Sequence, residues 1–241
     1  MTRLENELRF LKVYSAFLTI CLSVLALSAF QSRQRQKVLE VERLNIVSPD
    51  GKLALALAGR TQLPGPMMDG KAYPQDVSGG RTTSSGIIFF NESGDEVGGL
   101  TLTGSRTDSG YDAEGLLSFD QWKQDQVVAM QYVDHNGDRR AGLHIWDRST
   151  AYPIASALPL IAAFRRATGP ARDSLQREVQ RLRDEGKLGI HRMFLGTENQ
   201  KAMLRIEDTR GHVRARLSVD AKDVARLEFL DEKGKVVYAV P

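Results

Sequence analysis

The segment Met203–Val219, MLRIEDTRGHVRARLSV, decides the fold because apolar and polar residues alternate on both sides of a short turn. An apolar residue at every second position is typical of β-strands that bury one face. Asp208 is suited to accept hydrogen bonds from the amides of a tight turn, and Gly211 supplies the positive φ that closes it. The segment is therefore predicted to form a β-hairpin.

The same pattern occurs five times along the chain, which indicates a sheet built from repeated hairpins. A polar residue opens each turn and glycine follows three positions later, as in Ser48 and Gly51, Asn91 and Gly94, Asp134 and Gly137, Asp208 and Gly211, and Asp231 and Gly234. Each hairpin has one apolar face that needs cover. We expect a mainly β domain, folded as a barrel, a sandwich or a strongly curved sheet. The turns lack the spacing of a calcium loop, so no metal is expected.

A helical insertion, residues 155–187, interrupts the strand pattern after the third hairpin. Ser156 is suited to cap the first of two helices, Pro159 and Pro170 suit their first turns, and Gly169 and Gly186 end them. The second helix carries four arginines on its outer face, namely Arg172, Arg177, Arg181 and Arg183. This face is either a solvated surface or a basic docking surface for a protein partner or anionic headgroups.

The uncharged stretch Val13–Phe30, VYSAFLTICLSVLALSAF, reaches about 27 Å as a helix, close to the thickness of a bilayer core. We predict an uncleaved transmembrane anchor within residues 1–37 and an extramembrane domain over residues 38–241, with a cleaved signal peptide as the alternative. One helix face carries small residues suited to packing on other membrane helices, namely Ser15, Thr19, Ser23 and Ala26. Basic residues flank both ends almost equally. The flanking charges therefore do not set the orientation of the anchor. A short N-terminal tail before one anchor and a large domain favours a single-pass protein of the bacterial inner membrane, with its domain on the periplasmic rather than the cytoplasmic side.

The composition narrows the classes of function. The 241 residues carry 33 basic and 30 acidic side chains, a net charge of +3, with 41% hydrophobic residues and one cysteine. These values exclude a disordered chain, a polytopic membrane protein and a fold held by disulfides. A nucleic-acid surface is not expected, because the strands that carry aromatic residues are acidic.

The sequence contains no recognisable catalytic motif. The four histidines form no metal-binding pair, and neither a nucleophile elbow nor a Walker loop is present. We therefore expect no catalytic residues and no cofactor. The best polar candidate is Asp120–Gln126, where Asp120 and Asp125 flank Trp122. With the long loop 61–85, this segment is either an ordinary connection or a site for a polar ligand, and Trp122 is a candidate anchor for a partner.

Four stretches resemble a family of uncharacterised bacterial proteins with a single membrane anchor. They are LNIVSPDGK at 44–52, GIIFFNESGDEVGGLTLTG at 86–104, LLSFDQWKQDQVVAMQY at 116–132 and RAGLHIWDR at 140–148. The strings GDEVGGL and FDQWKQDQ are the most specific parts, and the resemblance covers roughly residues 10–148. It implies a membrane-anchored, β-rich domain, and it brings no activity and no site residues.

Two hypotheses about function follow from these features. The first is a non-catalytic accessory or structural subunit of a larger inner-membrane complex, such as a respiratory or photosynthetic one, that packs on partner subunits. The alternative is a membrane-anchored envelope domain that binds or processes a polar ligand through loop 61–85 and Asp120–Asp125.

Overall fold

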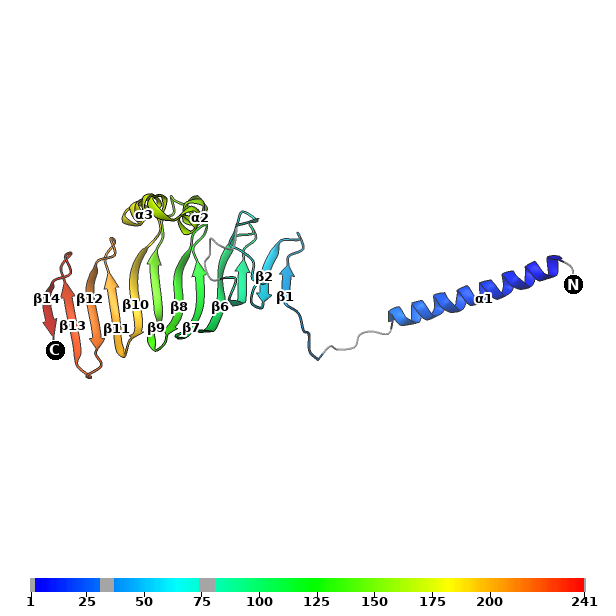
Figure 1. The fold of residues 1–241 in the computed structure, drawn as a ribbon, viewed down its shortest axis with the longest axis horizontal. Helices are drawn as coiled ribbons and strands as arrows, with labels where there is room; N and C mark the ends of the chain where they lie inside the picture. Colours follow the sequence, from blue (N-terminus) through cyan, green and yellow to red (C-terminus); the bar gives the residue numbers. More distant parts are fainter. Residues whose placement is uncertain (1–2, 31–36, 74–80, 241) are drawn as a thin grey trace. The chain divides into compact units, whose positions relative to one another are not determined.

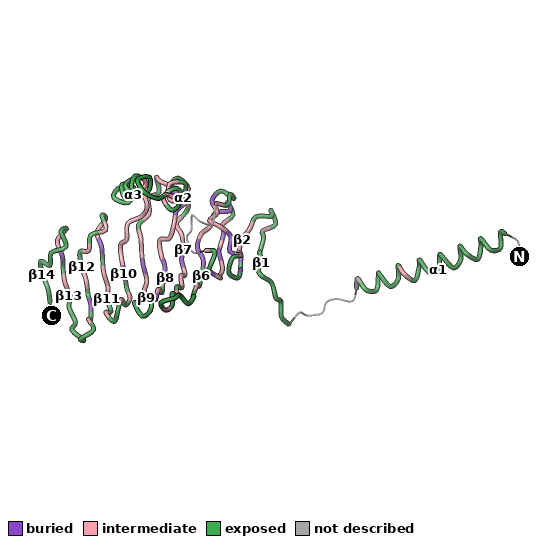
Figure 2. The backbone as a smooth tube through the Cα atoms, in the orientation of Figure 1, coloured by how far each residue is buried: buried purple, intermediate pink, exposed green. Residues whose placement is uncertain are grey.

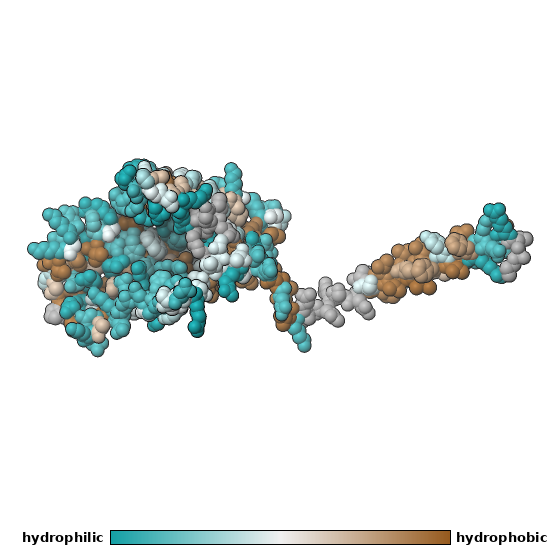
Figure 3. All heavy atoms as spheres, viewed as in Figure 1, coloured by the Kyte–Doolittle hydropathy of each residue, from teal (hydrophilic) through white to brown (hydrophobic). Residues whose placement is uncertain are grey.

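The computed structural model describes residues 3–30, 37–73 and 81–240. Contacts within the chain divide it into two units, Met1–Val41 and Glu42–Pro241, and each is described by itself. The first unit contains helix α1 (Arg3–Phe30), within which Arg3–Ser28 is long and apolar enough to cross a membrane. Figure 3 shows hydrophobic residues along most of this helix. The predicted small-residue face is exposed, and Thr19 Oγ1 donates to the Ser15 carbonyl oxygen at 2.8 Å.

The second unit is built on one antiparallel sheet of 12 strands within the described residues. Its strands, in spatial order, are β1 (Arg43–Val47), β2 (Leu53–Ala58), β5 (Ser85–Phe90), β6 (Glu96–Thr107), β7 (Gly110–Asp120), β8 (Gln126–His135), β9 (Asp138–Asp147), β10 (Ile190–Glu198), β11 (Lys201–Glu207), β12 (Val213–Val219), β13 (Ala225–Leu230) and β14 (Val236–Val240). This order is also their order in the sequence. A separate two-stranded ribbon joins β3 (Met67–Met68) and β4 (Lys71–Ala72).

The prediction of a mainly β protein with an N-terminal apolar helix and a large antiparallel sheet is confirmed. The expectation of a barrel or a sandwich is not met, because the described strands form one open sheet with β1 and β14 at its two ends (Figure 1). The reason is topological. Each strand pairs with its neighbours in the sequence, so the hairpins extend the sheet sideways, whereas a barrel requires the two end strands to pair.

Four of the five glycine turns share one geometry. The amides of Gly51, Gly94, Gly211 and Gly234 donate to the carbonyl oxygen three residues earlier at 2.8–3.1 Å, and their φ angles lie between 77° and 83°. The third turn, of Asp134 and Gly137, differs. Strands β8 and β9 stay paired as far as His135 and Asp138, so the connection between them is shorter. Asn136 and Gly137, both with positive φ, are left as a two-residue hairpin turn of the kind that the Asn-Gly dipeptide favours.

The inserted residues between β9 and β10 form a short 3-10 helix (Ile154–Ser156), α2 (Leu158–Arg166) and α3 (Gly169–Asp184). The expected cap at Ser156 is wrong, because Ala157 occupies that position and no side chain caps the helix. The helices lie at one end of the strands (Figure 1). Leu158 and Ala162 of α2 pack with Ile154 and Met68 in one of two small clusters of buried apolar residues. Figure 2 shows α3 largely exposed.

The second cluster joins β2, β5 and the segment after β2, and its member Ile88 lines the cavity described below. Its members are Ala56, Ala58, Leu63, Ile88 and Phe90. Both clusters are small for a unit of this size, so much of the apolar surface of the strands is not enclosed by the described part of the chain itself.

We predict that Gly142→Ala destabilises the sheet by about 1–3 kcal/mol. A Cβ at Gly142 would lie 2.5 Å from the Phe194 ring and 2.7 Å from the Leu195 carbonyl oxygen, and Phe194 is only 1% exposed. Chemical denaturation measures the loss. Gly104→Ala is the matched strand control, because its Cβ meets only the Asp112 carbonyl oxygen at an ordinary 3.9 Å. Equal effects at both positions would contradict the packing argument.

Candidate functional site

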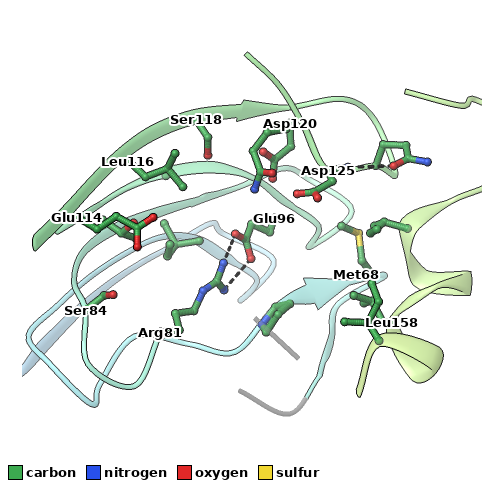
Figure 4. A pocket seen from close by; sticks show the side chains of 18 of the residues that line it. Met68, Arg81, Ser84, Glu96, Glu114, Leu116, Ser118, Asp120, Asp125 and Leu158 are labelled. Atoms are coloured by element: carbon green, nitrogen blue, oxygen red, sulfur yellow. Dashed lines mark hydrogen bonds and ion pairs between the residues drawn. The ribbon is translucent and has the colours of Figure 1, made fainter. Parts of the chain in front are cut away.

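A cavity of about 380 Å³ lies between one face of the sheet and α2 (Figure 4). Strands β6 and β7 supply its floor, including Glu96, Leu116 and Ser118, while Met68 of β3 and Leu158 of α2 close it from the other side. Figure 3 shows hydrophilic residues around a hollow below α2 and α3. The cavity is lined by both polar and apolar groups, as is typical of sites for small polar molecules.

A largely enclosed ion pair lies in the cavity wall. Arg81 Nη1 donates to Glu96 Oε2 at 2.9 Å, and Nη2 contacts Oε1, so the guanidinium and carboxylate form a two-pronged pair. The side chains are only 14% and 11% exposed, and Arg81 also donates to the Pro64 carbonyl oxygen at 3.1 Å. This geometry is the strong form of an ion pair. It neutralises Glu96 and ties the end of loop 61–85 to β6.

Asp120, the last residue of β7, is the most strongly perturbed acid of the cavity. Burial raises its pKa to about 8, and the negative charges of Asp125 and Glu96 act in the same direction. Its Oδ1 atom is buried and has no hydrogen-bond partner within the described part of the chain. At neutral pH the carboxyl therefore carries a proton, and it offers the cavity one donor and one acceptor.

The structure brings together the two regions that the sequence singled out for a polar ligand. Asp120 and Asp125 line the cavity together with loop residues Pro66, Met68, Arg81 and Ser84, while residues 74–80 of the loop lie outside the described part. Arg148, whose side chain is 7% exposed, lies 3.5 Å from Asp125. Burial lowers the pKa of this guanidinium from its usual value, although Asp125 and Asp120 act in the opposite direction.

Trp122, the predicted anchor, does not belong to this cavity. It is 63% exposed, and its ring lies 5.3 Å from the ammonium nitrogen of Lys123. Trp122 and Lys123 stand in the turn between β7 and β8, where Lys123 takes a φ of 57°. The tryptophan is thus available on the surface as a partner contact, separate from the cavity.

Lys123 connects three turns around the cavity. Its ammonium contacts Asp69 Oδ1 at 2.6 Å and Asp95 Oδ2 at 2.8 Å, and Asp95 is 1% exposed. Asp95 also accepts from the Asp69 amide at 2.7 Å and from Asn91 Nδ2 at 3.1 Å. Burial acts to raise the pKa of Asp95, but these hydrogen bonds and the Lys123 charge outweigh it and hold the pKa below its usual value. The carboxylate therefore fixes β3–β4, β5–β6 and β7–β8 to one another.

A chain of polar side chains that the sequence did not suggest crosses β9, β10 and β11. His144 Nδ1 lies 3.1 Å from His191 Nε2, and His191 Nδ1 lies 2.9 Å from Glu207 Oε1. Burial lowers the pKa of His144 to about 4, assisted by the His191 charge, so His144 is neutral at pH 7. His144 and His191 are 47 residues apart, so local spacing carries no signal of their contact. Among the described residues, no group of three His, Cys, Asp or Glu side chains is arranged to hold a metal.

The basic face of α3 is partly neutralised within the helix. Arg181 pairs with Glu178 at 2.6 Å and with Glu185 at 2.5 Å. The Arg172 guanidinium lies 4.6 Å from the centre of the Phe164 ring. Arg177 and Arg183 are exposed. The four predicted arginines therefore share one exposed helix, but the charge available to an outside partner is smaller than their number suggests.

The sheet has one continuous apolar face, defined by two rows of residues that are paired from strand to strand. The first row is Leu44, Leu57, Ile87, Leu100, Leu117, Met130, Leu143, Leu195, Leu204, Leu217, Leu227 and Val240. The second row is Ile46, Leu55, Phe89, Gly98, Phe119, Val128, Ile145, Met193, Ile206, Ala215, Phe229 and Tyr238. Neither row contains a charged residue.

This apolar face is uncovered within the described residues. Phe119 is 55% exposed, Met130 59%, Leu195 51% and Leu217 50%, although each has neighbours on both sides in the sheet. The cavity, α2 and the described part of loop 61–85 lie on the opposite face, because Ser118 lines the cavity whereas Leu117 and Phe119 belong to the two apolar rows. The described part of the chain therefore covers part of the opposite face of its sheet and leaves the apolar face open.

Comparison with known protein families and with curated proteins finds no match to this chain. The structural features themselves therefore carry the functional argument. The apolar face can bury apolar surface against a partner, and the cavity can bind a small polar molecule.

Proposed function

We propose that this protein is a non-catalytic structural subunit of a larger inner-membrane protein complex, held by α1 and packed on partner subunits through the apolar face. The observation that carries the proposal is the pair of uncharged rows crossing all twelve strands of the sheet. Soluble monomers rarely expose an apolar patch larger than a few hundred Å², and larger patches are typical of interaction surfaces. The proposal includes a sheet domain on the periplasmic side of the membrane.

The small-residue face of α1 supports the same proposal. Ser15, Thr19, Ser23 and Ala26 are exposed along the helix. Small side chains at such spacing allow another helix to approach closely, and the hydroxyl of Thr19 already bonds within its own helix. A partner helix would therefore meet a smooth surface without an unsatisfied donor at Thr19.

The test is a substitution that places a charge on the apolar face. The full-length tagged chain is extracted in mild detergent and co-purifying membrane proteins are identified by mass spectrometry. Met130→Lys is expected to reduce the yield of these subunits at least about 10-fold, because an unpaired charge is costly in an apolar contact. Gln131→Lys, the next residue on β8 and on the opposite face, is the matched control. A wild-type chain that purifies alone would overturn the proposal.

A second candidate function is the binding of a polar ligand in the cavity, favoured by the convergence of loop 61–85 with Asp120 and Asp125. A panel of small polar molecules would be screened for a shift in the unfolding temperature of the full chain. Asp125→Asn should remove any such shift while co-purification of subunits persists. If no molecule shifts the transition, the cavity has only a structural role.

A further inference from the structure

We infer that the partner seated on the apolar face is a second copy of this chain, packed face to face so that two open sheets form one two-layered β-sandwich. The inference rests on the proposed role of this face in assembly and names its occupant. The joined pair would then be the unit that enters the larger complex. The described elements of each chain cover part of the opposite face only, so a second copy would supply the cover for the apolar face.

The size of the face matches what a stable dimer needs. Twelve strands at about 4.8 Å spacing extend about 55 Å, and the two rows with their adjoining uncharged positions span about 20 Å along the strands. The face thus offers about 1,100 Å² per copy, whereas a standard stable interface uses about 800 Å² per partner. Only about three quarters of the face has to be in contact.

The chemistry of the face also favours a copy of itself. Its two rows present no charge, and the Tyr238 hydroxyl is their only polar side-chain group. The occupant must therefore be extended, apolar and free of unsatisfied hydrogen-bonding groups, since any such group would be buried without a partner. The same face of a second chain fulfils these conditions, because its backbone groups are already paired within the sheet. Contact can then be made in either direction along the strands.

The geometry of sheets gives a further reason. Two stacked sheets pack about 10 Å apart and need similar twist, because their strand directions stay within about 30° of each other. Two copies of one sheet have the same strand spacing and the same twist. The strands keep nearly the same direction across the sheet in Figure 1, and sheets of many strands with little twist are typically stabilised by stacking.

Two-fold symmetry makes a specific demand on the centre of the face. In a face-to-face pair the axis lies between the sheets, so residues near the centre of the interface lie opposite their own copies. Met130 on β8 and Leu143 on β9 are paired neighbours near the middle of the twelve strands. Each is therefore expected to lie within cross-linking distance of the same residue in the second chain.

The test uses cross-linking in native membranes. In a Cys21→Ser background, which removes the only cysteine, the full chain carries either Met130→Cys or the control Gln131→Cys from the opposite face. A short bifunctional maleimide is added and chains of double mass are counted on a denaturing gel. Met130→Cys is expected to give at least about 10-fold more dimer than the control, as is a second variant, Leu143→Cys.

Three outcomes overturn the inference. If both faces cross-link equally, the chains meet by random collision. If neither central variant cross-links while a monofunctional maleimide labels the thiol, the face is open. If the thiol is protected without cross-linking and the chain also has the mass of a single copy in mild detergent, another protein or lipid acyl chains cover the face. If the central variants give no cross-linked dimer while Met130→Lys still releases other subunits, only the self-pairing is contradicted. If they cross-link but no other subunits co-purify, only the proposed complex is contradicted.

Discussion

At pH 9, Asp120→Asn is expected to be more stable than the wild-type chain by about 5 kcal/mol, whereas the two should differ little near pH 4. The pKa of Asp120 is raised from 3.8 to about 8 in the fold. Between pH 3.8 and pH 8 the folded chain keeps a proton on Asp120 that the unfolded chain releases. The contribution of Asp120 to stability therefore falls as the pH rises through this window and levels off above the folded pKa.

The measurement is denaturant unfolding of the full chain in detergent across pH 4–9. The stability difference between Asp120→Asn and the wild type should grow steadily from about pH 4 to pH 8. This comparison cancels the other titrating groups, among them His144, whose lowered pKa makes stability rise with pH up to about 6.5 in both chains. Asp173→Asn, which removes an exposed carboxylate on α3, is the control and should keep the wild-type slope. Parallel slopes for the wild type and Asp120→Asn would show that Asp120 is ionised in the fold.

Asp95→Ala is expected to lower the free energy of unfolding by about 3–5 kcal/mol, because it leaves the Lys123 ammonium without its buried partner. Asp95 is 1% exposed, and it also accepts hydrogen bonds from the Asp69 amide and from Asn91. Removal of the carboxylate therefore loosens three turns at once. The loss should appear in urea unfolding at pH 7.

A double-mutant cycle identifies the ion pair as the cause. Lys123→Met alone leaves Asp95 buried without its cation, while the combination with Asp95→Ala removes both charges. The double variant should be more stable than the sum of the single losses implies. Strict additivity would show that Asp95 acts through its hydrogen bonds from Asp69 and Asn91 and not through Lys123.

The alternation of apolar residues predicted the sheet well, but it did not predict what covers it. Leu204 and Ile206 alternate with polar residues whether the apolar face meets a second layer of the same chain or nothing at all. Closure depends on a pairing between β1 and β14, which are about 190 residues apart in the sequence and carry no local signal of it. The turn after β8 differs in detail from the prediction, because Asn136-Gly137 is itself a strong turn signal that competes with Asp134.

The cavity was likewise predicted in part from the sequence. Loop 61–85 and Asp120–Asp125 were recognisable as polar segments between strands, and they do meet in space. Their partners were not recognisable, because Arg81 pairs with Glu96 and Arg148 with Asp125 only through the order of strands.

The neighbour-to-neighbour order of the strands makes the sheet resemble a repeat protein in its energetics. Each hairpin contacts mainly the hairpins beside it, so stability is expected to add along the sheet and unfolding to begin at its end strands. Contacts close in sequence also favour rapid folding. For the same reason, gain or loss of one hairpin leaves the pairing of the others intact and changes the width of the sheet by about 10 Å. The number of duplicated hairpins therefore sets how much apolar surface the protein can present to a partner.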